Sequence, residues 1–190
     1  MSKRPSGQPM HDPRMLRAIA HPVRNRILNE LTAQGSLRAA DVARELDIPA
    51  NQASFHLRQL AKYGLIEEDP DAARDRRDRV WRAVSPQGFT VELRNLEKQP
   101  GGKAATAVFR RTARDWGHAV VDSVYAAQRD RDAHASATEM ALRLTKEEAA
   151  AFARELDDVA DRWQQRTRGR DPRRRTYVHL SVVTPHPDAD

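Results

Sequence analysis

Two short helical patterns joined by a tight turn, within residues 36–65, constrain the fold of this chain more than any other feature. Ser36 offers an N-cap to the first pattern, whose apolar residues recur at helical spacing as far as Leu46. The joint "DIPAN" follows, and the second pattern runs from Pro49 to about Tyr63, where Gly64 stops it. Two helices joined this closely predict a helix-turn-helix.

The segments on either side fit the same unit. Residues 13–35 predict two helices, with Pro22 near the first turn of the second and Gly35 as its C-cap. After Gly64, "LIEED" and "DRVWRAVS" predict two short strands separated by the polar turn "PDAARDRR". A helix-turn-helix followed by a two-stranded hairpin predicts a winged DNA-binding domain.

The second helix of the motif has an apolar face and a polar face. Ala53, Leu57 and Leu60 share the apolar face at 100° per residue. Arginine, asparagine and glutamine can pair with base edges, a cation or hydroxyl can hold phosphate, and an aromatic ring can meet a thymine methyl. A merely solvated helix face would carry similar residues. The candidate DNA-reading residues are Asn51, Gln52, Ser54, Phe55, Arg58, Gln59 and Lys62.

Charge favours an anionic partner, because the chain carries a net charge of +6 and 32% charged residues. Nucleic acid is the first expectation and a membrane surface the second. Positive charge gathers at the predicted wing tip, in Arg74, Arg76, Arg77 and Arg79, while the acids of residues 67–71 oppose it. Double-stranded DNA is therefore the expected partner, with the wing arginines on phosphates.

The segments "HPVRNRILNEL", "ADVARELDIPANQASFHLRQLAKYGLIEE" and "RDRVWRAV" resemble the winged helix-turn-helix of ArsR-like bacterial transcription regulators. The resemblance covers about residues 13–85. It implies a homodimer on an inverted-repeat operator, with the second helix of the motif in the major groove and the wing on the minor groove or backbone. Metal-sensing members of the family use cysteines, and this chain has none; Asp132 and His134 resemble half of a second metal site. We expect neither metal nor cofactor.

The second half predicts a different architecture. "QPGGK", residues 99–103, predicts a linker before a long helix. Residues 138–144 and 176–183 alternate like strands and flank a helix opened by a Thr145–Glu148 capping box, so a small β-α-β unit is expected. The aromatic and apolar residues Trp116, Val120 and Trp163 are candidates for an effector pocket or an interface.

The histidines and the arginine-rich loop fit structural roles better than functional ones. His56 lies at the edge of the apolar face and is expected to be structural. The loop at residues 166–175 holds six arginines and one aspartate; a solvated loop is favoured over additional phosphate contacts.

These patterns predict an α+β, mainly α protein and exclude several functions. No cysteine is available for a disulfide, zinc thiolate or nucleophile, and no catalytic motif is found, so we expect no enzyme. No secretory signal or run of ~18 apolar residues is found, which predicts a cytoplasmic protein that is not embedded in a membrane. The expected parts are a disordered tail (1–10), a winged helix-turn-helix domain (11–88), a linker (89–103) and a dimerisation or effector region (104–190).

The function predicted is a sequence-specific, homodimeric transcription repressor, with an unknown small-molecule effector as a possible further partner. Two alternatives stay open at this point. One is a winged-helix module that contacts proteins and has lost DNA binding. The other is a small-molecule-binding protein governed by its C-terminal half.

Overall fold

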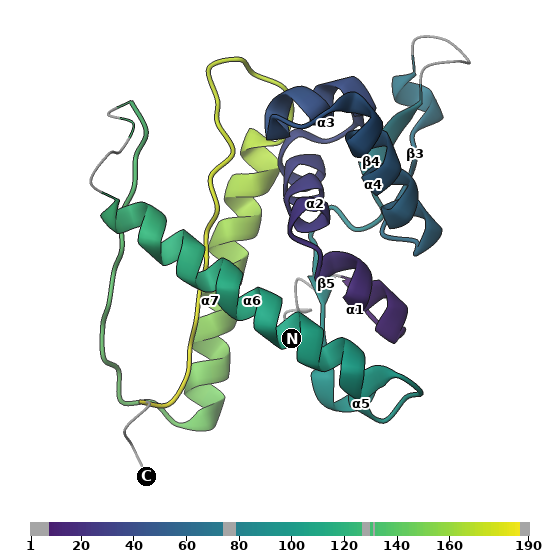
Figure 1. Cartoon of the computed structure of the whole chain (residues 1–190). Coiled ribbons are helices and arrows are strands. Elements are labelled where there is room, and N and C mark those ends of the chain that lie inside the picture. Colours follow the sequence, from purple (N-terminus) through teal and green to yellow (C-terminus); the bar gives the residue numbers. More distant parts are fainter. Residues whose placement is uncertain (1–7, 74–78, 127–129, 131, 187–190) are drawn as a thin grey trace.

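The computed structural model describes residues 8–73, 79–126, 130 and 132–186 (Figure 1). The helices are α1 (Pro13–Ile19), α2 (Pro22–Gln34), α3 (Ala39–Leu46), α4 (Ala50–Lys62), α5 (Leu93–Glu97), α6 (Gly102–Tyr125) and α7 (Lys146–Thr167), with a 3-10 turn, η1 (Pro70–Ala72). The strands are β1 (Gln8–Pro9), β2 (Leu37–Arg38), β3 (Ile66–Glu68), β4 (Val80–Ala83) and β5 (Phe89–Thr90).

Local signals fix the ends of the first four helices. The Asp12 carboxylate caps α1 by accepting a hydrogen bond from the Arg14 amide at 2.8 Å. Pro22 occupies the first turn of α2, and Gly35, with φ of 89°, follows its end. The C-cap of α3 is Asp47, which adopts the left-handed conformation with φ of 52°. The predicted positions of these helices are confirmed, but the predicted N-cap of α3 is wrong. Arg38 is the N-cap, whereas Ser36 precedes β2 and its hydroxyl donates to the Asp69 carboxylate.

The hydrophobic core lies where these helices meet the small sheet. Ala53, Leu57 and Leu60 of α4 are fully buried, so the predicted apolar face is the one that packs inward. Their neighbours from other elements include Leu16, Ile27, Leu31, Leu37, Val42, Leu65, Ile66 and Trp81. This core sets the angle at which α4 is presented to solvent.

The wing is an antiparallel sheet in the order β2-β4-β3. Glu68 pairs with Trp81 and Ile66 with Ala83 along β3 and β4, and Leu37 of β2 pairs with Trp81 on the other side. The two predicted strands are therefore confirmed as a hairpin. The short strand β2 was not predicted.

The predicted tail and linker differ from the structure. Residues 8–10 do not continue a tail: β1 pairs in parallel with β5, and Met10 is buried in the core. The expected linker, residues 89–103, holds β5 and α5, and Leu96 is buried. A Cβ on Gly102 would lie 1.8 Å from the Leu96 carbonyl oxygen, so only glycine lets α6 start this close to α5. These segments pack because they carry apolar residues that the core accepts.

The first turns of α6 also belong to the N-terminal unit, because Ala105 and Thr106 are fully buried. The expected boundary at residue 104 therefore falls inside a helix. Beyond this point α6 runs away from the core, and α7 passes behind it in the view of Figure 1.

The predicted β-α-β unit is not formed. Its helix, α7, is present with its capping box: the Thr145 amide donates to the Glu148 carboxylate at 2.7 Å, and the Glu148 amide donates to the Thr145 hydroxyl at 3.2 Å. Residues 138–144 and 176–183 are extended but make no strand, since neither has a hydrogen-bonded neighbour strand in the described chain. No helix within the described residues is long and apolar enough to cross a membrane.

Candidate nucleic-acid interface

The outward face of α4 carries the residues that the sequence singled out. Asn51, Gln52, Arg58 and Lys62 are exposed, and Phe55 is 49% exposed. Ser54 and Gln59 are half-buried at the edges of this face. Because Ala53, Leu57 and Leu60 anchor the opposite side, these side chains are directed into solvent together. We call this set of seven residues the α4 outer face.

Few intramolecular contacts restrain the α4 outer face. Arg58 has no ion pair within the described part of the chain. The Lys62 ammonium lies 5.8 Å from the centre of the Tyr63 ring, and the Phe55 ring meets the His56 ring edge-on at 5.3 Å between centroids. Asn51 accepts a hydrogen bond from the Gln52 amide through its side-chain oxygen at 2.9 Å. The charged groups here are therefore available to an incoming ligand.

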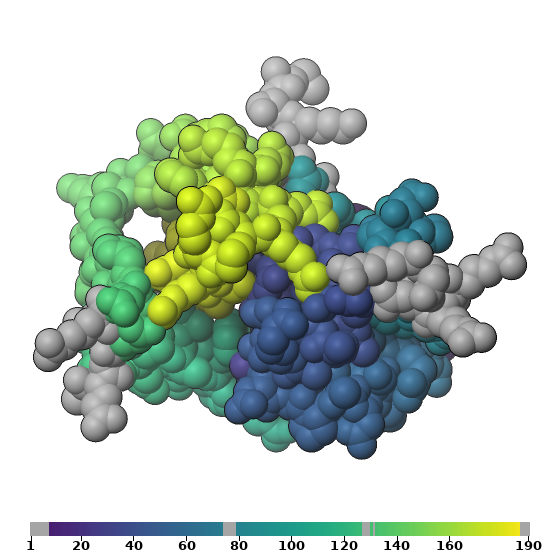
Figure 2. Space-filling model, turned by 90° about the horizontal axis from the view of Figure 1, so that it is seen from above, coloured from purple at the N-terminus to yellow at the C-terminus, as the bar shows by residue number. Residues whose placement is uncertain are grey.

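The C-terminal half does not cover this face. Helices α2 and α3 stand between α4 and α7, with α7 on the opposite side of the helix-turn-helix (Figure 1). In the space-filling view, the yellow and green C-terminal residues gather beside the blue residues of the helix-turn-helix (Figure 2). A long ligand can approach α4 without displacing the C-terminal half.

The hairpin beside α4 neutralises its own acids. Arg82 lies 2.8 Å from the Glu67 carboxylate and 3.6 Å from that of Asp69, and Arg79 lies 3.4 Å from Glu68. Three of the four acids that seemed to oppose the wing charge, Glu67, Glu68 and Asp69, are thus paired with Arg79, just before β4, or with Arg82 within it. Arg74, Arg76 and Arg77 lie outside the described residues; Arg79 is exposed. Arg79 is available to phosphate only in competition with an exposed ion pair, which is worth little.

A pair of histidines supports α4 from behind. The His56 ring packs against the His21 ring, with centroids 4.7 Å apart, and the Nδ1 atoms of both are buried without a hydrogen-bond partner. Burial lowers the pKa of His56, and the nearby His21 and Arg24 lower it further. Burial and Arg24 likewise lower the pKa of His21. His56 is therefore structural, as predicted; its partner His21 was missed because the two are far apart in sequence.

Acidification is expected to destabilise this histidine pair. A histidine whose pKa is lowered by folding binds fewer protons folded than unfolded, so its contribution is complete above its ordinary pKa of 6.5 and is lost as the pH falls below it. Urea unfolding at pH 8 and pH 5.5 should show a loss of stability that is smaller in His56→Gln. The exposed His118→Gln is the control. An unchanged pH effect in His56→Gln would contradict this role.

A buried carboxylate ties the helix-turn-helix to the C-terminal half. Asp41, at the start of α3, is 3% exposed and accepts from the Arg38 amide at 3.0 Å. The Arg170 guanidinium approaches the same carboxylate to 2.6 Å, and that of Arg44 to 3.4 Å. Burial opposes ionisation of Asp41, but the hydrogen bonds from Arg170 and Arg38 outweigh it and hold its pKa well below the usual value.

The arginine-rich loop is therefore docked, and the expectation of a solvated loop is wrong for its centre. Besides the Arg170 ion pair, the Gly169 amide donates to the Ala33 carbonyl at 3.3 Å, and the Thr176 hydroxyl donates to the Glu30 carboxylate at 2.7 Å. Arg173 and Arg174 pair with Asp171 in the loop itself, and Arg175 pairs with Asp130. The partners outside the loop, Asp41, Ala33, Glu30 and Asp130, lie far from it in sequence, so no local signal predicted the docking.

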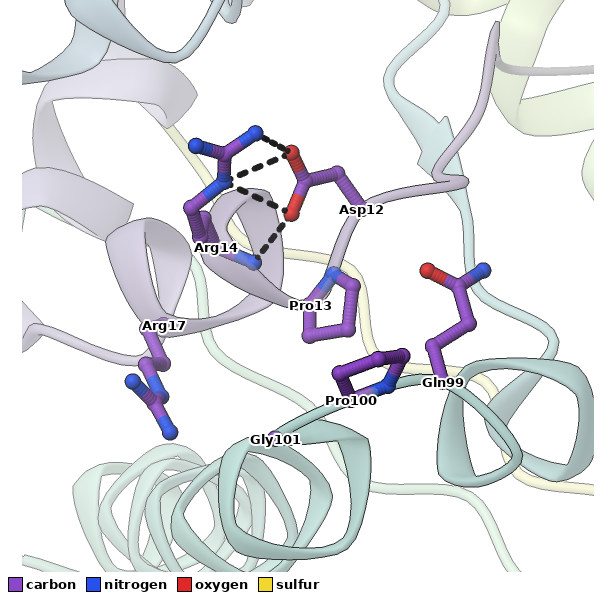
Figure 3. A pocket seen from close by; sticks show the side chains of 7 residues that line it. All are labelled: Asp12, Pro13, Arg14, Arg17, Gln99, Pro100 and Gly101. Carbon is purple, nitrogen blue, oxygen red and sulfur yellow. Dashed lines mark hydrogen bonds and ion pairs between the residues drawn. The ribbon is translucent and has the colours of Figure 1, made fainter.

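The candidate effector residues are not gathered around one cavity. Trp116 and Val120 are half-buried on α6, whereas Trp163 on α7 is 58% exposed and stacks under the Arg166 guanidinium at 4.1 Å. A hollow of about 280 Å³ lies elsewhere, between α1 and the start of α6 (Figure 3); its lining residues are Asp12, Pro13, Arg14, Arg17, Gln99, Pro100 and Gly101. The effector pocket stays a prediction.

No metal centre is found among the described residues, since no group of three or more histidine, aspartate or glutamate side chains there is arranged to hold a metal ion. Asp132 and His134 are thus not part of such a group in that part of the chain. Asp130 and Tyr177 are their neighbours: the Asp132 amide donates to the Asp130 carboxylate, and the His134 amide donates to the Tyr177 hydroxyl at 3.3 Å.

Comparison with known proteins places the N-terminal part of the chain. Residues 19–69 match the family model of a helix-turn-helix domain. Among solved structures, ZitR from Lactococcus lactis, a mutant in apo form, is similar at 15% identity and a TM-score of 0.32, over 76% of this chain and 83% of that one. NMB1585, a MarR family regulator from Neisseria meningitidis, is similar at 17% identity and a TM-score of 0.29, over 79% and 76%. No curated protein matches.

Proposed function

We propose that this chain, whose residues 19–69 match a helix-turn-helix domain, is an ArsR-like DNA-binding transcription regulator. In this proposal it acts as a cytoplasmic homodimer that represses transcription from an inverted-repeat operator. The observation that carries the proposal is the α4 outer face, which combines donors and acceptors for base edges with two cations and lies open to solvent. The helix-turn-helix match over residues 19–69, which includes all of α4, supports the same proposal.

In this proposal α4 enters the major groove. Arg58 is the candidate for bidentate pairing with a guanine, because it is exposed near the middle of the helix and has no ion pair among the described residues. Asn51 and Gln52 stand at the N-terminus of α4, the end of a recognition helix that meets base edges in helix-turn-helix complexes. Lys62, in the last turn, is placed for a phosphate.

A homodimer would present two copies of α4 to successive major grooves about 34 Å apart along the duplex. Each half of an inverted repeat would then meet the same side chains in the same orientation. Binding across a promoter would exclude the transcription machinery, which is the reason for proposing repression. A small-molecule effector, with Trp116, Val120 or Trp163 in its site, remains part of the proposal without a cavity to support it.

Titration of the purified chain with duplex DNA tests this function directly. A random duplex of roughly 20–30 base pairs accommodates two half-sites one turn apart, and at about 50 mM salt the electrostatic contribution is strong. Binding measured by fluorescence anisotropy is expected, with affinity falling as salt rises. A protein-interaction module that has lost DNA binding would give no change in anisotropy under these conditions.

Wing arginines are expected to act through phosphates without sequence preference. Replacing Arg74, Arg76, Arg77 and Arg79 together by alanine should weaken binding to all duplexes alike. Each lost phosphate contact should reduce the slope of log affinity against log salt by roughly 0.9. An equal number of exposed arginines changed on α6 and α7 controls for net charge. A salt slope equal to that of the wild type would exclude the wing from the contact.

A further inference from the structure

The C-terminal half of the chain has no core of its own. Within the described residues after Thr106, through residue 186, no residue is buried. This span includes most of α6, all of α7 and both extended segments. Ordering a segment of this length with only half-buried apolar side chains is unfavourable, because little offsets the lost conformational entropy. Another surface must therefore complete it.

Apolar side chains of this half are exposed in patterns that repeat. On α7, Val159 and Trp163 are four residues apart and are 44% and 58% exposed. On α6, Val121 and Tyr125 have the same spacing and are 49% and 73% exposed. Residues four apart share one helix face, so each helix presents an apolar patch with an aromatic ring, the composition typical of protein interfaces.

The two extended segments present strand edges. Met140, Leu142 and Leu144 alternate along residues 138–144, and Val178, Leu180 and Val182 alternate along residues 176–183; all are at least 41% exposed. No backbone amide of residues 138–144 or 177–183 donates to another backbone carbonyl in the described part of the chain. An exposed extended segment with unpaired amides and one apolar side is a template for pairing with another strand.

The second strand is best supplied by the same chain. The chain exposes 14072 Å², whereas a compact monomer of 21.5 kDa is expected to expose about 9,200 Å². The excess, roughly 4,900 Å², far exceeds the ~800 Å² that each partner contributes to a standard interface. In a two-fold symmetric dimer each copy contributes the same two segments, so the unpaired backbone amides of both segments can find partners in the other copy.

We propose that a second copy of this chain completes the core of the C-terminal half. Residues 138–144 and 176–183 of one copy would form backbone strand pairs with the same two segments of the other copy. The inference rests on the proposed homodimer and states how it is made. The dimer would transmit a fixed geometry to α4, because residues 169–176 are bound to α3 through Arg170 and to α2 through Gly169 and Thr176.

Sedimentation of the full-length chain at micromolar concentration tests the proposal. The wild type should have twice the mass of 21.5 kDa. Leu142→Asp and Leu180→Asp should shift it to the monomer, because a charge cannot enter the apolar contact. Ser181→Asp, next to Leu180 on the other side of the same segment, should remain a dimer. A monomeric wild type, or dimers in both leucine variants, would overturn the proposal.

Cross-linking covers the case in which a leucine variant fails to fold. Because the chain has no cysteine, single cysteines can be introduced without background. Arg143→Cys and Ser181→Cys chains, one of them tagged, should form a mixed cross-linked dimer with a short bis-maleimide. Arg94→Cys on α5 should not. Absence of any cross-link from both segment positions would count against the pairing.

The same proteins separate this inference from the proposed function. A wild-type dimer that binds no duplex DNA would end the regulator proposal and leave the dimer contact standing. A wild type that binds DNA as a dimer, with both leucine variants still dimeric, would end the contact and leave the regulator standing. Monomeric leucine variants should still bind a single half-site weakly, because α4 is not part of the contact.

Discussion

Replacing Arg58 with alanine is expected to weaken binding to the preferred operator by about 1–3 kcal/mol, roughly five- to 150-fold in dissociation constant. The side chain is exposed on α4 and has no ion pair among the described residues, so its loss removes a contact to DNA and leaves the fold intact. A bidentate pair with guanine also discriminates against the other bases. The variant should therefore lose preference at one base pair of each half-site.

Fluorescence anisotropy with the operator and with singly substituted duplexes measures both effects. Arg94→Ala is the matched control, since Arg94 is an exposed arginine on α5 and its loss changes the net charge equally. Urea unfolding of both variants should give wild-type stability. Unchanged operator affinity and unchanged base preference in Arg58→Ala would remove this residue from the readout.

Asp41→Asn should have the largest effect on stability, about 2 kcal/mol in the free energy of unfolding. Removing one partner of a fully buried ion pair costs about 3–5 kcal/mol, but Arg170 and Arg44 keep access to water, which lowers the expected cost. The amide can still cap α3 through its oxygen. Because the folded pKa of Asp41 is lowered, its stabilising effect is present above the usual 3.8 and is lost at lower pH; the variant should lack this acid sensitivity.

Chemical denaturation measures the free energy of unfolding of Asp41→Asn and of the control variant Asp47→Asn. Asp47 lies exposed at the other end of the same helix in a left-handed conformation, which asparagine tolerates. Combining Asp41→Asn with Arg170→Ala closes a double-mutant cycle, and a coupling of about 1 kcal/mol is expected. A coupling of zero would mean that the loop after α7 does not hold α3 in solution.

The recognition helix could be predicted from sequence because its signals are local. Helical periodicity through Ala53, Leu57 and Leu60 and the stop at Gly64 set its bounds and its buried face. The exposed face of α4 is then the opposite side of the helix. The wing strands were predictable for the same reason, since β3 and β4 are consecutive in the sequence and pair with each other.

The remaining features depend on contacts between distant residues. Residues 8–10 have the composition of a tail, and only pairing with β5 fixes them. Arg170 lies in a run of arginines that looked solvated, and only the fold brings it to Asp41. His21 becomes informative only beside His56. Sequence periodicity reports local structure, so it cannot reveal which residues far apart in the sequence come into contact.

The expected β-α-β unit is not formed within one chain, because its strands also depend on contacts that the local sequence does not specify. Alternation in residues 138–144 and 176–183 correctly marks extended segments with one apolar side. It does not specify which strand lies beside them. If the proposed dimer forms, the alternation was a signal for pairing between chains.

Selection of bound sequences from a random duplex pool, followed by footprinting of the enriched site, tests the central claim most directly. If the α4 outer face reads DNA as proposed, one inverted repeat should be enriched, with two protected half-sites about 34 Å apart. The Arg58→Ala chain should then enrich a site with one relaxed position in each half. Absence of any enriched sequence with the wild-type chain at low salt would contradict the account.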